Sequence, residues 1–341
     1  MKRSSVWQRV ASLSLVGVAI CSLVYLIRRE GASQVLGAVT SARWFVLFAV
    51  PLCALWNVLA VLSWHGILRS IWPTRVNSIA WLLLSRFAAQ SVNSLVPTFG
   101  LGGEALRSGA ARNGGVPMAV SVVATAVDNI AGVIGGLLFT SIVLGIEIYR
   151  LPTLHAASYV ILEAALFVVT SVALWQSRRV LWWMTKFWKN TSVIAVRQYI
   201  ATPRFARALY KAVLWRACER LLWAGELWLG FFASGQSVAL CDASLLVGGL
   251  FLVSLVFFII PSQWGAAEGV MVMLGRLLGI APSAMLAVAL LRRGRQLLTS
   301  VLALPAVPWV TRVATRSANG GREGGPPGAP IGEGAACTSS I

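Results

Sequence analysis

Long apolar runs are the feature of this sequence that most restricts its fold. About 20 apolar residues, each rising roughly 1.5 Å in a helix, cross a bilayer core of about 30 Å. The clearest runs are Val6–Ile27, Trp44–Trp64, Ile130–Ile146 (extending back to Met118), His155–Trp175, Ala212–Ala233 and Leu245–Ile260, and a seventh, Ala284–Val310, is interrupted by Arg292, Arg293, Arg295 and Gln296. Hydrophobic residues make up 57% of the 341 residues and charged residues 12%, which is too apolar for a soluble domain of this size. We therefore expect an all-α, polytopic membrane helix bundle.

The first run admits two interpretations. Lys2 and Arg3 precede it, as basic residues precede a secretory signal sequence. However, the 22 residues of Val6–Ile27 are longer than a usual signal core, and no small-x-small cleavage pattern ends them. These features favour a membrane span.

The net charge of +18 comes from 29 Lys and Arg against 11 Asp and Glu. In a soluble protein this excess would indicate a nucleic-acid partner. In a membrane protein, basic residues gather instead in cytoplasmic loops and beside anionic headgroups. We therefore expect membrane lipids as partners and no nucleic acid. The five cysteines have no disulfide or metal-ligand spacing, and we expect no cofactor.

The segment Ser177–Lys211 carries eight basic residues and no acidic one, and it is the strongest indicator of orientation. We expect a cytoplasmic loop with a tryptophan-rich helix in the headgroup layer, and a specific lipid-headgroup site is the alternative. Both termini should also face the cytoplasm. Residues 312–341 include a Gly- and Pro-rich tail that we expect to be disordered.

A simple count of crossings conflicts with this orientation. If every apolar run crossed, including Ile79–Val96, a cytoplasmic N-terminus would place the basic loop outside the cell. The conflict disappears if Ile79–Val96 and Leu245–Ile260 enter the bilayer and turn back. We therefore predict that both are re-entrant segments.

Two segments with proline and glutamate at the same spacing, Pro97–Glu104 and Pro261–Glu268, indicate an internal repeat with an offset of 164 residues. The same offset places the run Trp44–Trp64 over Ala208–Trp228, with a tryptophan at the end of each. A short Pro-to-Glu pattern is weak evidence alone, but the crossing count supports it independently.

The repeat divides the chain into residues 1–150 and 151–311, each with three spans and one re-entrant segment. An odd number of crossings turns the second half upside down relative to the first. We therefore predict two inverted repeats. Secondary transporters are often built this way, with binding sites near the midplane where broken segments meet.

Charged and amide side chains within the apolar runs mark candidate site residues, because they are unfavourable in a bilayer unless they face a cavity or a partner. Arg86, Gln90 and Asn93 share one helical face, and Arg107 follows Glu104 at pairing distance. The predicted substrate-binding set is Arg86, Asn93, Glu104, Arg107, Asp128, Glu268 and Arg292.

Each of these groups also has a purely structural interpretation. Glu104 and Glu268 each follow a chain break and could cap a helix N-terminus. The group Arg216, Glu219 and Arg220 can form ion pairs along one helix. Arg292, Arg293 and Arg295 either extend to an interface or form a phosphate or carboxylate site, which arginine suits geometrically.

These residues also carry a family resemblance. The first set is Ser91-Val-Asn-Ser-Leu-Val-Pro97, Gly102-Gly-Glu104, Arg107, Gly115-Val-Pro117 and Asp128, and the second is Pro261 through Gly265 to Glu268-Gly269, Leu274-Gly275, Leu290-Leu-Arg-Arg293, Arg295 and Leu297-Leu298. They resemble two signatures of the lysylphosphatidylglycerol synthase transmembrane-region (flippase-like) family, closest to its hopanoid-biosynthesis-associated branch. The resemblance covers about Val6–Val310 and implies a bacterial inner-membrane fold that handles lipid, often by translocation. One position departs, because Asn129 follows Asp128 where many relatives have arginine.

We therefore expect a flippase-like lipid transporter for a hopanoid, polyprenyl or phospholipid. The sequence has no Gly-x4-Gly-Lys-Ser/Thr motif, so transport would be passive or coupled to an ion gradient. The alternatives are a membrane enzyme that modifies a lipid carrier, with Glu104 or Asp128 as acid or base, and a non-transporting scaffold. Because a short tail follows Val310 in place of an aminoacyl-transferring domain, and because His65 and His155 lack a partner motif, we expect no enzyme. Protein partners would be a second copy of the chain or lipid-biosynthesis enzymes.

Overall fold

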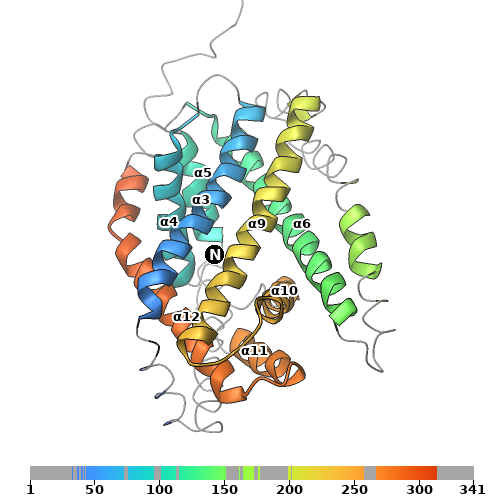
Figure 1. The fold of residues 1–341 in the computed structure, drawn as a ribbon. Helices are drawn as coiled ribbons and strands as arrows, with labels where there is room; N and C mark the ends of the chain where they lie inside the picture. The colour runs from blue at the N-terminus through green and yellow to red at the C-terminus, as the bar shows by residue number, and fades with distance from the viewer. Residues whose placement is uncertain are drawn as a thin grey trace, which may run out of the picture.

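The computed structural model describes residues 44–72, 76–95, 101–112, 115–150, 164–172, 202–256 and 266–312, with a few isolated positions between them. Every principal element in these ranges is a helix (Figure 1). The elements are α3 (Phe45–Ile71), α4 (Ile79–Leu95), α5 (Leu101–Ala111), α6 (Met118–Arg150), α9 (Pro203–Ala233), α10 (Leu240–Val256), α11 (Ala266–Leu277) and α12 (Pro282–Ala303). The predicted all-α class is confirmed for the described part of the chain.

Helices α3 and α9 form the centre of the bundle and run antiparallel (Figure 1). The start of α3 packs against the end of α9, where Phe45 and Ala233 share a cluster. At the other end, Trp64 and Phe205 belong to one apolar core. The α9 helix begins at a capped turn, because the Thr202 hydroxyl accepts a hydrogen bond of 3.2 Å from the Phe205 amide.

Two helical hairpins flank this central pair at opposite ends. Helix α4 packs against α5 beside the upper part of α3, whereas α10 packs against α11 beside the lower part of α9 (Figure 1). Gly103 permits the first contact, because a Cβ there would lie 2.5 Å from the Ala89 carbonyl oxygen. The Gly103 amide donates to Asn93 Oδ1 at 2.8 Å, which holds α5 onto α4.

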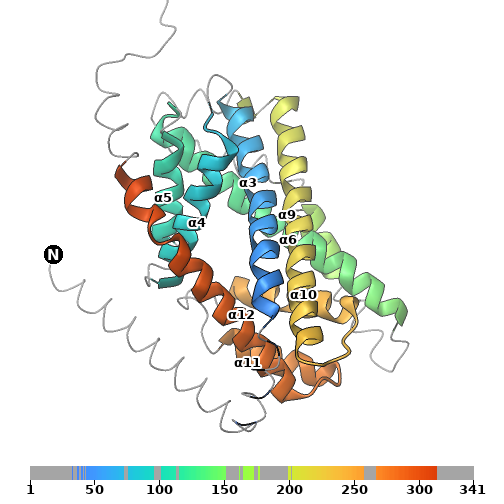
Figure 2. The same ribbon diagram turned by 60° about the vertical axis from the view of Figure 1, so that its left-hand side comes forward.

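Helices α6 and α12 run obliquely and connect the two hairpins (Figure 2). Helix α6 packs against α5 and α10, and α12 packs against α11 and α4. The short helical stretch after α12 lies on the first hairpin, where Val310 shares a buried cluster with Ala88 and Ala110. Each half of the chain therefore sends a helix onto the hairpin of the other half.

The helices agree with the predicted apolar runs at several positions. Two of them, Phe45–Ile71 and Met118–Ile148, are long and apolar enough to cross a membrane by length and composition. Charged residues interrupt the apolar sequence of α9 and α12, which is why these two long helices do not pass the same test. Predictions for Val6–Ile27, most of His155–Trp175, residues 177–198, Pro97, Pro261 and the tail from residue 313 lie outside the described residues.

Candidate functional site

Asp128, at 0% exposure on α6, is the centre of the first cluster of buried charges. Its Oδ2 accepts hydrogen bonds from Arg107 on α5, at 2.7 Å, and from Arg216 on α9. Its Oδ1 accepts a hydrogen bond of 2.6 Å from the Ser63 hydroxyl on α3. Four helices thus converge on one carboxylate. Two arginines compensate its negative charge in a position where an unpaired ion would be strongly unfavourable.

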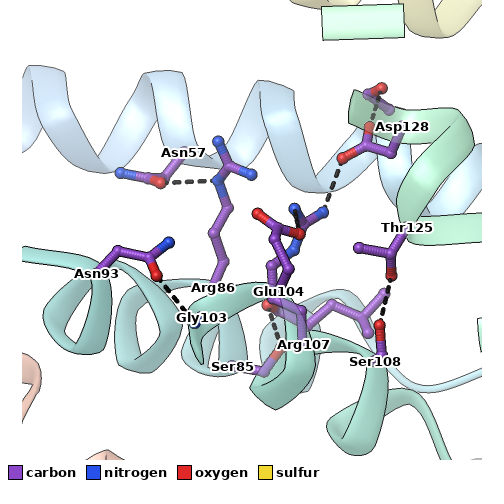
Figure 3. Close-up of polar contacts among 12 residues, drawn as sticks. Asn57, Ser85, Arg86, Asn93, Gly103, Glu104, Arg107, Ser108, Thr125 and Asp128 are labelled. Atoms are coloured by element: carbon purple, nitrogen blue, oxygen red, sulfur yellow. Dashed lines mark hydrogen bonds and ion pairs between the residues drawn. The ribbon is translucent and has the colours of Figure 1, made fainter. Parts of the chain in front are cut away.

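The cluster continues from Arg216 toward α4. Arg216 Nη1 donates to Glu219 Oε2 at 2.8 Å, and Glu219 Oε1 lies 3.5 Å from Arg86 Nη2. Arg86 Nε donates to Asn57 Oδ1 at 2.9 Å, as Figure 3 shows. Residues of both halves of the chain therefore alternate in charge through the bundle interior.

The other end of this cluster reaches the surface of the first hairpin. Arg107 lies between Asp128 and Glu104, whose Oε2 accepts from Arg107 Nη1 at 3.0 Å (Figure 3). The Arg107 guanidinium also lies 4.5 Å from the ring centroid of Trp64. The Glu104 side chain is 31% exposed, so it is the member of this cluster most open to the surroundings.

A second cluster lies around α12 and contains two ion pairs. Arg293 Nε donates to Glu268 Oε1 on α11 at 2.6 Å. Arg295 Nε and Nη2 both donate to Glu226 Oε1 on α9, at 2.8 and 2.7 Å. Arg295 is 3% exposed, so Arg293 and Arg295 pair inside the bundle instead of extending to an interface. The structure also places Arg295 Nη1 3.3 Å from Cys53 Sγ on α3.

Two hollows lie at opposite ends of the bundle. A basic groove of about 370 Å³ lies between the end of α3 and the start of α9, lined by Arg204, Arg207, Lys211 and Ser63 among others. An apolar groove of about 210 Å³ lies between α6, α10 and α11, with the buried Glu147 in its lining. Ser63 belongs to the basic groove and also donates to Asp128, so this groove borders the first cluster.

The structure brings most of the predicted site residues together in two groups. Arg86, Glu104, Arg107 and Asp128 belong to the first cluster, and Glu268 belongs to the second. Arg292 lies beside the second cluster, with its guanidinium carbon 4.9 Å from the Trp223 ring centroid. Asn93 stands apart from both clusters, at the contact between α4 and α5.

Four contributors were not predicted from the sequence: Asn57, Ser63, Cys53 and Trp223. Asn57 carried a usable signal, because an amide within an apolar run requires a partner. The other three are common in membrane helices and gave no such signal. Among the described residues, no group of three or more His, Cys, Asp or Glu side chains could hold a metal ion.

A helical bundle with two apolar helices long enough to cross a membrane and paired charges in its interior is consistent with a helical membrane protein. The family model described as "Lysylphosphatidylglycerol synthase TM region" matches residues 10–303. The chain therefore belongs to this family of membrane proteins. Neither a curated protein nor a solved structure matches the chain.

Proposed function

We propose that the protein moves an amphiphilic lipid across the bacterial inner membrane, through a polar route between two inverted halves. One observation supports the proposal most directly: the charge clusters lie in the interior of the bundle, which has a basic groove at one end, bordering the first cluster at Ser63, and an apolar groove at the other. Such an interior gives a lipid headgroup polar partners while its tail stays in hydrocarbon. We favour a hopanoid, polyprenyl or phospholipid as the cargo, and we propose that the protein does not alter it chemically.

The packing pattern supports an inverted repeat. Exchanging α3 with α9, α4 with α10, α5 with α11 and α6 with α12 converts every closely packed pair of described helices into another packed pair. The antiparallel course of α3 and α9 is what inversion requires of equivalent helices (Figure 1). The offset of 164 residues also separates Met118, where α6 begins, from Pro282, where α12 begins.

The inversion can be tested at two arginines that the same offset relates, Arg112 and Arg276. Each would be changed to cysteine in a protein whose native cysteines are serines, and labelled with a membrane-impermeant maleimide in oriented vesicles. We expect Arg112→Cys to react from the cytoplasmic side and Arg276→Cys from the periplasmic side. Reaction of both from one side contradicts the inverted repeat, and the reverse pattern, with Arg112→Cys reacting from the periplasm, contradicts the cytoplasmic termini.

Transport can be tested in liposomes that contain the purified full chain and a labelled lipid, by following movement between leaflets. We expect faster exchange for at least one of the three lipid classes. Glu104→Gln and Glu268→Gln should slow it about tenfold, because each removes a charged partner from the route.

The matched control is Arg69→Gln, which removes an exposed charge on α3 outside both clusters and should leave exchange unchanged. If no candidate lipid moves faster than in empty liposomes, the transport proposal fails. Appearance of a chemically altered lipid would instead identify a membrane enzyme.

A further inference from the structure

Trp223, in the second half of α9, has two arginines against its ring. The guanidinium carbon of Arg220 lies 4.7 Å from the ring centroid of Trp223, and that of Arg292 lies 4.9 Å from it. Arg220 also lies 4.7 Å from the ring centroid of Phe251. The two cations come from different helices, α9 and α12, and they meet on one aromatic side chain.

Neither arginine has a carboxylate partner within ion-pair distance among the residues that the structure describes. Glu219 precedes Arg220 in the chain, but its two oxygens face Arg216 and Arg86. Glu226 lines the same small cavity as Arg292, but its Oε1 accepts both hydrogen bonds from Arg295. The nearby acids are therefore already engaged with other arginines.

Further donors in this place also lack an acceptor. Trp223 Nε1 is buried without a hydrogen-bond partner, and so is Nε1 of Trp56, whose ring meets the Trp223 ring edge-on at 5.6 Å. Buried N–H groups are nearly always paired, so unpaired ones indicate a missing acceptor. Arginine and tryptophan side chains donate hydrogen bonds and accept none.

The charges of the two clusters differ in the same sense. The first cluster balances Arg86, Arg107 and Arg216 against Glu104, Asp128 and Glu219. Around α12, by contrast, Arg293 pairs with Glu268 and Arg295 pairs with Glu226, whereas Arg292 has no carboxylate within ion-pair distance in the described part of the chain. Arg220, on α9, follows Glu219 in the chain, but its guanidinium contacts the rings of Trp223 and Phe251. Contact with an aromatic face attracts a cation, but it neither neutralises the charge nor accepts its N–H bonds. An anion would supply both.

We propose that Arg220 and Arg292, together with Trp223, bind the anionic headgroup of an amphiphile through a phosphate or carboxylate group. Guanidinium groups present paired donors that match these anions. The cavity beside Trp223 is lined by Arg292 and Glu226 and by the apolar side chains of Phe45, Leu227, Val247 and Val288, and Arg220 is not among its lining residues. Its volume of about 10 Å³ has room for about one water, so the occupied site requires these side chains to separate. The inference rests on the proposed function for its lipid ligand, but the binding event is separate from transport.

The probe is phosphatidic acid, compared with diacylglycerol of the same acyl chains, which differs only in lacking the phosphate. Both lipids would be titrated into the purified full chain in non-ionic detergent, with bound lipid counted by native mass spectrometry. We expect one tight phosphatidic acid site and no comparable site for diacylglycerol. Sodium phosphate is the third arm, and displacement of phosphatidic acid by it would assign the site to a free anion instead of a headgroup.

The variants decide whether this binding belongs to Trp223 and its two arginines. Arg220→Gln and Arg292→Gln should each weaken phosphatidic acid binding about 10-fold to 100-fold, because each removes a charged donor. Trp223→Phe keeps an aromatic ring but removes the N–H, and should weaken binding about 2-fold to 10-fold. Arg69→Gln makes the same charge change on the outside of α3 and should bind as the unaltered protein does.

The proposal is overturned if Arg220→Gln and Arg292→Gln bind phosphatidic acid as tightly as Arg69→Gln. A second readout separates a binding role from a structural one. Without lipid, Arg292→Gln should melt at or above the temperature of the unaltered protein, since it removes a half-buried charge that has no carboxylate partner. Melting as far below it as Arg295→Gln, which breaks an ion pair, would show that Arg292 is a structural element and would also overturn the proposal. If phosphatidic acid binds in an arginine-dependent way but no lipid moves in liposomes, the transport proposal fails and the binding proposal stands.

Discussion

The two charge clusters are made of the same residue types, but they use them differently. Around Asp128, each arginine meets a carboxylate, and the carboxylate with the least exposure receives two arginines and a hydroxyl. Around α12, two arginines are paired and two lie on Trp223. Charged side chains therefore have two different environments in one bundle. Arginines paired with carboxylates connect neighbouring helices, and the anion site proposed above uses the two arginines that lie on an aromatic ring instead.

The largest effect is expected where pairing is most complete. Asp128→Asn preserves the shape of the side chain but leaves Arg107 and Arg216 without their shared carboxylate. We expect it to lower the free energy of unfolding by about 3 to 5 kcal/mol, as measured in mixed micelles with denaturant. A loss below about 1 kcal/mol would mean that Glu104 and Glu219 are sufficient partners for the two arginines.

A sharper comparison uses two arginines of one helix. Arg295→Gln leaves Glu226 buried without its partner and should cost about 3 kcal/mol of stability. Arg292→Gln removes a cation from Trp223 and should change stability by less than about 1 kcal/mol, or raise it. The same unfolding measurement on both variants checks this. Equal losses would remove the distinction between the two clusters.

A smaller effect is expected in the hairpin that presents Glu104 and Arg107. Gly103→Ala adds a Cβ that would meet the Ala89 carbonyl oxygen at 2.5 Å, and should cost about 1 to 3 kcal/mol. Gly269→Ala in α11 is the matched control, because a Cβ there meets nothing within 4 Å. It should be neutral or stabilising by up to about 1 kcal/mol. Thermal unfolding of both variants tests whether the first hairpin is the more tightly packed of the two at these positions.

The sequence predicted those parts of the fold and site that depend on local spacing. Apolar runs predicted α3 and α6, and the three-residue spacing of Glu104 and Arg107 predicted their ion pair. The pairing of Asp128 with Arg216 spans 88 residues and has no local pattern. Only the packing of α6 on α9 creates it. The pair formed by Glu226 and Arg295 was missed for the same reason.

Some residues contact a different partner in three dimensions from the one that their spacing in the sequence predicts. Arg220 was grouped with Arg216 and Glu219 along one helix, but its guanidinium lies between Trp223 and Phe251. Asn93 shares a helical face with Arg86, yet its amide oxygen accepts the Gly103 N–H. In each case a neighbouring helix offered a contact that a single-helix pattern does not contain. The part of Ser63 in the first cluster could not be predicted from the sequence, because a hydroxyl side chain in an apolar run is common.

The pairing of Arg86 with Glu219 has a consequence for biosynthesis. The two residues are 133 positions apart, so at about 5 to 20 residues per second the ribosome needs roughly 7 to 27 seconds between them. During that interval α4 has been made while its acidic partner does not yet exist. Until α9 has been made, Arg86 therefore lacks the acidic partner that it has in the folded bundle. The ion pair between the two halves is a late contact, timed by synthesis of the second half of the chain.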